Sequence, residues 1–148
     1  MEVDFALLSD RADIVNGKLY MLGGAFDTLF GANVPVKNQS MTLVMRFLFS
    51  APELNQVYKM EVRLIDSDGK KIISVPGQLA VKETPKAVQG YRTSVLTAIN
   101  FFNTQFPKFG DYSFDIFVGE RCVKSVQLRV MQPMTPPKVK PQKPEPPK

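Results

Sequence analysis

The sequence has no histidine and only one cysteine, and both shortages limit the chemistry that the chain can perform. Histidine is the commonest general base and a principal ligand of zinc and iron, so its absence excludes Ser-His-Asp and Cys-His catalysis. A single thiol cannot hold a thiolate zinc site or an iron–sulfur cluster within one chain. Gly23-Gly24 lacks the lysine and the hydroxyl residue of a phosphate-binding loop. The sequence therefore predicts a non-enzymatic protein with no cofactor and no catalytic or metal-binding residues.

The lone cysteine and the apolar segments also bear on location. Cys122 has no partner for an internal disulfide, which favours a reducing compartment. The opening residues lack the basic start and unbroken apolar stretch of a secretory signal. No apolar run reaches the ~18 residues that a membrane helix needs. We therefore expect a cytoplasmic protein without membrane contact. As a nucleophile Cys122 would lack a histidine partner, so a small structural residue is the better interpretation.

The charge of the chain is uneven. The net charge is +5, of which +3 lies from Pro133 onward, so the rest of the chain carries only +2. A basic nucleic-acid footprint is therefore absent from the body, and nucleic-acid binding is not favoured. Residues 133–148 hold seven of the twelve prolines and no aromatic residue. This composition cannot offset the cost of ordering by burial, and it predicts one domain over residues 1–131 and a disordered tail over 132–148.

Alternating apolar and polar side chains, typical of half-buried strands, recur along the body. The clearest segments are 41–49, 57–66, 111–118 and 121–130. Turn sequences separate such segments: Asn16-Gly17, Asp66-Ser67-Asp68-Gly69 and Gly119-Glu120. No window shows a sustained helical stripe. The pattern predicts an all-β, antiparallel, two-sheet sandwich of about seven to nine strands.

Other segments allow weaker predictions. Arg92–Phe102 is expected to be a strand, although both of its faces are partly apolar. Stretches 35–40 and 84–90 are predicted to be loops, and Pro76-Gly77 indicates a bulge or a sheet edge. Tyr112 begins a strand two residues before a core position, as in the tyrosine corner of immunoglobulin-like sandwiches. An ordinary alternating strand that includes a tyrosine is the equal alternative.

Acidic residues offer two weak candidate sites. Asp66 and Asp68 are spaced like calcium ligands, but Gly77 stands where an EF-hand needs its glutamate. Loop calcium would require Asp111 or Glu120 to approach them, and a solvated turn is the better interpretation. The acids in or near the last hairpin are Asp111, Asp115 and Glu120. They would have to converge to act as an acid–base pair, whereas an outer polar face explains them more simply.

Four phenylalanines lie within nine residues and form the most unusual feature of the body: Phe101, Phe102, Phe106 and Phe109. Adjacent residues of a strand point to opposite faces, so Phe101 and Phe102 cannot both enter one core. Packing on both sides of the sheet and at its end is the favoured interpretation. The alternative is an exposed apolar patch, which makes these four the candidate partner-binding residues.

Two stretches carry a resemblance to a known family. Phe5–Asp10 and the run Asn16-Gly17-Lys18-Leu19-Tyr20-Met21-Leu22-Gly23-Gly24-Ala25-Phe26 fit the pattern L-L-x-D-x-A … G-K-L-x-x-L-G-G-x-W. The chain therefore resembles a family of small, functionally uncharacterised bacterial proteins, a domain of unknown function. Phe26 replaces the expected tryptophan, and the tail lies outside the resemblance. The resemblance implies the fold and a bacterial or phage origin, and it implies no activity.

The missing catalytic groups favour a non-enzymatic protein-interaction module, whose partner is another protein or a second copy. A structural or assembly subunit, bacterial or phage, is the alternative. A carboxylate enzyme built on a sandwich would need two acids at a defined separation in a cleft. A nucleic-acid binder would rest on the tail lysines and would bind with strong salt dependence. Both of these are less favoured.

Overall fold

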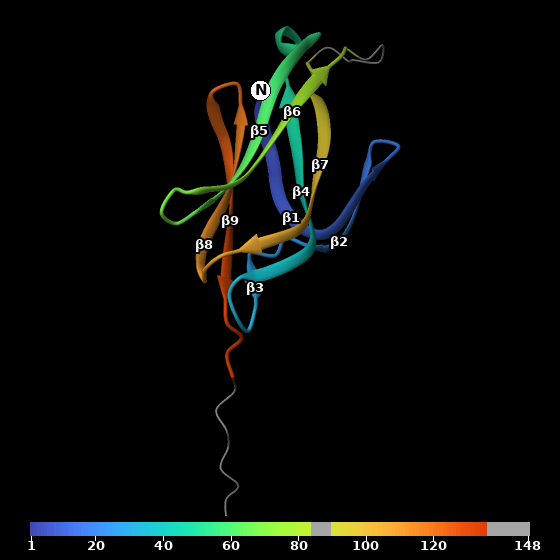
Figure 1. The fold of residues 1–148 in the computed structure, drawn as a ribbon. Helices are drawn as coiled ribbons and strands as arrows, with labels where there is room; N and C mark the ends of the chain where they lie inside the picture. The colour runs from blue at the N-terminus through green and yellow to red at the C-terminus, as the bar shows by residue number, and fades with distance from the viewer. Residues whose placement is uncertain (84–89, 136–148) are drawn as a thin grey trace, which may run out of the picture.

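Two β-sheets make up the part of the chain that the computed structural model describes, residues 1–83 and 90–135 (Figure 1). The four-stranded sheet has the order β2-β1-β4-β7, and the five-stranded sheet has the order β3-β9-β8-β5-β6. One short 3-10 helix, η1, joins the sheets between β4 and β5. The elements are β1 (Glu2–Val15), β2 (Lys18–Gly24), β3 (Thr28–Phe30), β4 (Val36–Phe49), η1 (Ala51–Glu53), β5 (Gln56–Asp66), β6 (Lys71–Val81), β7 (Thr93–Phe106), β8 (Gly110–Val118) and β9 (Arg121–Met131).

The all-β, two-sheet prediction is confirmed, and two details of it are wrong. The sheets are not wholly antiparallel, because β3 runs parallel to β9, with Leu29 beside Val130. Stretch 35–40 is mostly strand, because Val36 pairs with Phe106 and turns its side chain into the core. Its partner is distant in the sequence, so the local loop-forming residues gave no sign of the pairing. The predicted strand at 92–102 is confirmed as β7. Residues 84–89 and most of the predicted tail lie outside the described residues.

Aromatic rings join the two sheets across the core. Phe101 of β7 meets Phe114 of β8 edge-on, with ring centroids 5.1 Å apart. Phe106 meets Tyr112 in the same way at 5.0 Å. Such edge-to-face pairs are favoured over face-to-face stacks because the ring edge is positive and the ring face negative. Each pair joins one residue of the four-stranded sheet to one of the five-stranded sheet, so together they hold the layers in register.

Turn geometry explains the hairpins. Asn16 and Gly17 have φ angles of 51° and 73°, as the tight turn between β1 and β2 requires. Before β8, the Tyr112 hydroxyl donates to the Lys108 carbonyl at 2.7 Å and accepts from the Lys108 amide at 3.1 Å. Pro76 and Gly77 lie in β6, which forms an edge of its sheet, so the edge interpretation of this pair is confirmed. None of the helices in the described residues is long and apolar enough to span a membrane.

Candidate interaction surface

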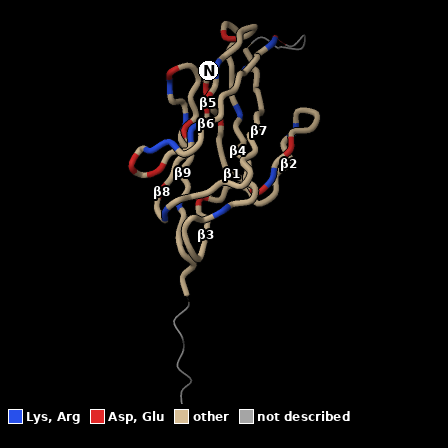
Figure 2. The backbone as a smooth tube through the Cα atoms, viewed as in Figure 1, with Lys and Arg blue, Asp and Glu red and all other residues tan. Residues whose placement is uncertain are grey.

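The two sheets have four edge strands, and three of these carry features that discourage pairing with other chains. β3 has only three residues, β6 contains Lys71 and Pro76, and the short β2 begins with Lys18. Short length, lysine and proline are the usual protections of an exposed edge. β7 has none of them: its 14 residues include no charge, no proline and no glycine. Figure 2 shows β7 without blue or red along its length. Within the described residues, no strand pairs with its outer side.

The four clustered phenylalanines do not form one patch. Phe101 is only 4% exposed and Phe106 is fully buried, so both belong to the core. Phe102 is 67% exposed on the opposite side of β7, and Phe109 is partly exposed in the following loop. The extended backbone separates Phe101 from Phe102, as alternation along a strand requires. Of the four sequence candidates, only Phe102 and Phe109 are therefore available to a partner.

Phe102 lies on the outer face of the four-stranded sheet, and this face is unusually apolar. Strand register places Leu7, Val44 and Ala98 side by side across it. The next row along the sheet joins Phe5, Arg46 and Leu96. Val44 is fully buried there although no second layer covers it among the described residues.

The outer face of the five-stranded sheet is polar instead. There Arg63 donates to Glu61 at 2.8 and 2.9 Å, and Ser125 donates to Asp115 at 2.7 Å. Arg63 also lies over the Phe117 ring, with the guanidinium carbon 4.1 Å from the ring centroid. Polar and ionic contacts therefore satisfy this face within the chain, and only the four-stranded sheet presents an apolar exterior.

Five of the twelve large apolar side chains that are exposed in the described residues lie on the β1–β2 hairpin. Pairing of β1 with β4 ends at Ser9 and Thr42, and residues 11–22, here called the arm, pair only with one another. Figure 1 shows this hairpin, in blue, reaching away from the body. Leu22 is 70% exposed and Tyr20 is 57% exposed. The other large exposed apolar residues of the arm are Ile14, Val15 and Met21. An isolated two-stranded ribbon is marginally stable in water, and an exposed apolar surface of this kind is a candidate interaction site.

A glycine with a positive φ angle and a backbone hydrogen bond define the base of the arm. Gly23 has a φ of +60°, and a side chain there would collide with the Asp10 carboxylate. Ala25 then donates its amide to the Leu8 carbonyl at 2.7 Å, which returns the chain to the body. Sequence reasoning found the hairpin but missed the arm. Its sequence signal is the apolar side chains that stand on both faces around Asn16-Gly17.

The candidate calcium ligands Asp66 and Asp68 lie at the turn between β5 and β6, where Asp66 accepts backbone hydrogen bonds. Asp66 accepts the Asp68 and Lys70 amides, both at 2.9 Å, and the Lys70 hydrogen bond is the main cause that lowers the pKa of Asp66. The Lys108 ammonium lies 2.7 Å from the Asp68 carboxylate and 3.8 Å from the Asp66 carboxylate. Asp111 pairs with Arg129. Across the described ranges, no three acids, cysteines or histidines are grouped to hold a metal ion.

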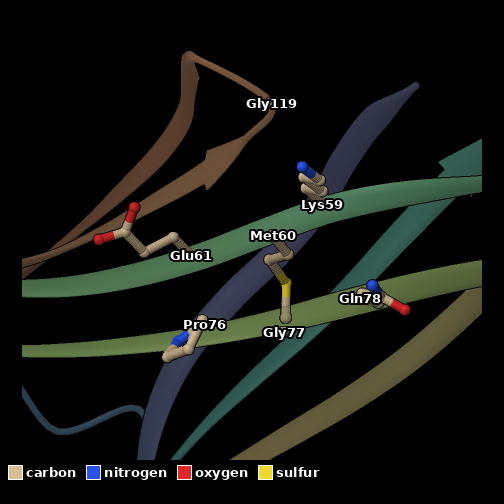
Figure 3. Close-up of a pocket in the computed structure, with 7 residues that line it drawn as sticks. All are labelled: Lys59, Met60, Glu61, Pro76, Gly77, Gln78 and Gly119. Carbon is tan, nitrogen blue, oxygen red and sulfur yellow. The ribbon is translucent and has the colours of Figure 1, made fainter.

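An open depression of about 660 Å³ lies beside β5, β6 and Gly119, and Figure 3 shows the residues that line it. Met60 points toward Gly77, where an added Cβ would stand 3.3 Å from the Met60 methyl carbon, and Lys59 and Glu61 border the hollow. Hydrogen bonds from Arg63 and then Ser74 lower the pKa of Glu61 to about 2, so this carboxylate stays ionised at neutral pH and cannot supply a proton. The lining includes no serine, threonine or cysteine.

Cys122 is exposed, so its side chain does not belong to the core. The register of β8 and β9 shifts between Ile116 and Phe117 and places Cys122 opposite Phe117 on the polar outer face. Its Sγ lies 3.7 Å from the Lys124 carbonyl and 3.8 Å from the Ser125 hydroxyl. Neither neighbour is a base that would activate the thiol.

Comparison with known proteins places the chain in a family. A family model matches residues 4–131, and the chain belongs to that family, a family of unknown function (DUF6941). The match covers both sheets and includes the arm and β7. No curated protein matches the chain.

Proposed function

We propose that this domain is a non-enzymatic protein-interaction module that binds its partner through the arm and the uncharged edge of β7. The observation that carries the proposal is the arm, a ribbon whose two faces both expose large apolar side chains. Tyr20 is well suited to the centre of such a contact, because tyrosine combines a large apolar ring with a polar hydroxyl and is enriched among residues that dominate binding energy. The edge of β7 adds backbone groups that can pair with an incoming strand.

The fold supports this role. We infer that the two sheets form an immunoglobulin-like sandwich, in which connections cross between the layers from β4 to β5 and from β6 to β7. The hydrogen bond from Tyr112 to the carbonyl four residues upstream has the geometry of a tyrosine corner, which supports the assignment. Sandwiches of this kind commonly present edges and loops to other proteins. A crystal structure in which β4 and β5 belong to one sheet would contradict the inference.

Site-specific photo-crosslinking in cells that make the full chain tests the interaction. A benzoylphenylalanine at Tyr20 reports contacts of the arm, and the same group at Gln127 reports contacts of the polar face of β9. We expect ultraviolet light to produce protein adducts from position 20, several-fold above those from position 127. Adducts of equal yield at both positions, or none from the arm, would contradict the proposed function.

A structural or assembly subunit is the second candidate. The observation that favours it is the sheet order, because the arm strand β2 and the uncharged strand β7 form opposite edges of one sheet. A chain with two such edges has the features needed to join copies of itself. The crosslinking experiment separates the candidates by adduct mass, since self-association adds one further chain of 16.6 kDa.

A further inference from the structure

The exposed apolar arm and the unprotected strand β7 lie on opposite edges of the four-stranded sheet, and the lysine of β2 stands at its first residue, outside segment 19–22. The arm supplies β2 at one edge, and the charge-free β7 forms the other. We propose that β2 of one copy pairs with β7 of a second copy, so that the sheet continues from molecule to molecule. This inference rests on the proposed function and identifies the partner as a second copy of this chain.

Strand direction permits this contact without turning the second copy over. β1 is antiparallel to both β2 and β4, and β4 is antiparallel to β7. β2 and β7 therefore run in opposite directions within one sheet. When copies stand side by side in the same orientation, β2 of one meets β7 of the next in antiparallel fashion, which is the slightly more stable arrangement.

Side chains match on both faces of the joined sheet. On the outer face, Tyr20 and Leu22 of the arm would lie beside Leu96 and Ala98 of the neighbouring β7. In the register that sets Tyr20 opposite Ala98 and Leu22 opposite Leu96, the inner face brings Leu19 opposite Ile99 and Met21 opposite Thr97. Because β7 carries no charge, Lys18 and the other charges of the arm meet no like charge there. Directly opposed apolar side chains are the main stabilising contacts between strands.

A second copy is the occupant that these observations favour, because one kind of contact covers both exposed features. A different protein bound to the arm would leave the 14-residue edge of β7 open, and the reverse also holds. The contact joins two different surfaces, so each added copy presents a new free edge. Such a head-to-tail contact produces a ring or a filament, depending on the rotation between copies. Association should therefore extend beyond dimers and rise with protein concentration.

Crosslinking of the purified full chain tests the pairing. With benzoylphenylalanine at Leu22, ultraviolet light should give dimers and larger species, and mass spectrometry should place the attachment within residues 93–106 of a second copy. Attachment to the arm of the second copy would overturn the pairing, as would the absence of any adduct. The proposed function has a separate criterion. It fails if benzoylphenylalanine at position 20 of the arm gives no more adducts in cells than the same group at position 127.

Charge placed on the edge provides an independent test. The double variant Ser94→Lys/Phe102→Lys adds two lysines at exposed positions of β7 and should reduce the crosslinked species and the light-scattering mass to those of a monomer. The matched control, Gln78→Lys/Ala80→Lys, adds the same charge at exposed positions of the β6 edge and should leave both unchanged. Circular dichroism verifies that both variants are folded. Equal association of the two variants would overturn the proposal.

Discussion

Replacing Phe101 or Phe102 by alanine tests the division of the phenylalanine cluster between core and surface. The two residues are neighbours of the same type on the same strand, so the substitutions remove the same atoms from almost the same place. Their surroundings differ completely: the Phe101 side chain is 4% exposed and packs edge-on against Phe114, whereas the Phe102 side chain is 67% exposed. Any difference in cost therefore measures burial, not chemistry.

The structure gives the expected magnitudes. Deleting a buried phenylalanine side chain costs ~3–5 kcal/mol of unfolding free energy, because transfer energy is lost and a cavity remains. The lost ring pair contributes ~0.5–1.5 kcal/mol of that cost. Phe102 has only about a third of its surface covered, so its removal should cost ~1 kcal/mol or less. We expect Phe101→Ala to be less stable than Phe102→Ala by at least ~2 kcal/mol.

Urea denaturation followed by circular dichroism measures both changes. At a slope of ~1.5–2 kcal/mol per molar urea, the Phe101→Ala midpoint should fall by roughly 2 M. The titrations are run at low protein concentration, because Phe102 also lies on the proposed edge contact. Equal losses for the two variants, or a larger loss for Phe102→Ala, would show that the faces of β7 are assigned wrongly.

Three further predictions concern the turns and the tail. Tyr112→Phe removes the hydroxyl that bridges the Lys108 amide and carbonyl and should cost about 1–2 kcal/mol in the same urea titration. The pKa of Asp66 is lower in the folded chain than in the unfolded chain, so its stabilising effect is present above the ordinary pKa and lost as the pH falls below it. Asp66→Asn should therefore be less stable at neutral pH and should flatten the acid limb of a melting-temperature profile; an unchanged limb would refute this. Deleting residues 133–148 should leave the melting temperature within ~1 °C, and a drop of several degrees would mean that these residues contact the body.

Local contacts determine how much of the fold could be predicted from the sequence. The β8–β9 hairpin was predicted because its two alternating segments are joined by the short turn Gly119-Glu120. Residues 36–40 were predicted wrongly because their partners, such as Phe102 opposite Ser40, lie some sixty residues away. The parallel pairing of β3 with β9 has the same cause. Alternation can show that a segment is extended, but it does not identify a distant partner strand.

In the candidate interaction surface, too, the sequence predicts the local features but not those that depend on distant segments. Alternation alone separates Phe101 from Phe102, but which of them is buried depends on where Phe114 lies in the other sheet. Asn16-Gly17 predicts a hairpin whether or not it projects. The exposure of Tyr20 and Leu22 depends instead on the point where β1 stops pairing with β4, at Ser9. That point is a property of the register between distant segments.

The requirements of folding do not explain why β7 lacks charge. Its exposed outward positions include Ser94, Asn100 and Phe102, and charged side chains there would leave the core contacts of Val95 and Phe101 intact. Exposed edges ordinarily carry such charges because they prevent unwanted pairing. The other long edge, β6, has both a lysine and a proline within 11 residues. The missing charge is therefore a feature of the surface of β7, and the proposed pairing of another strand at this edge would account for it.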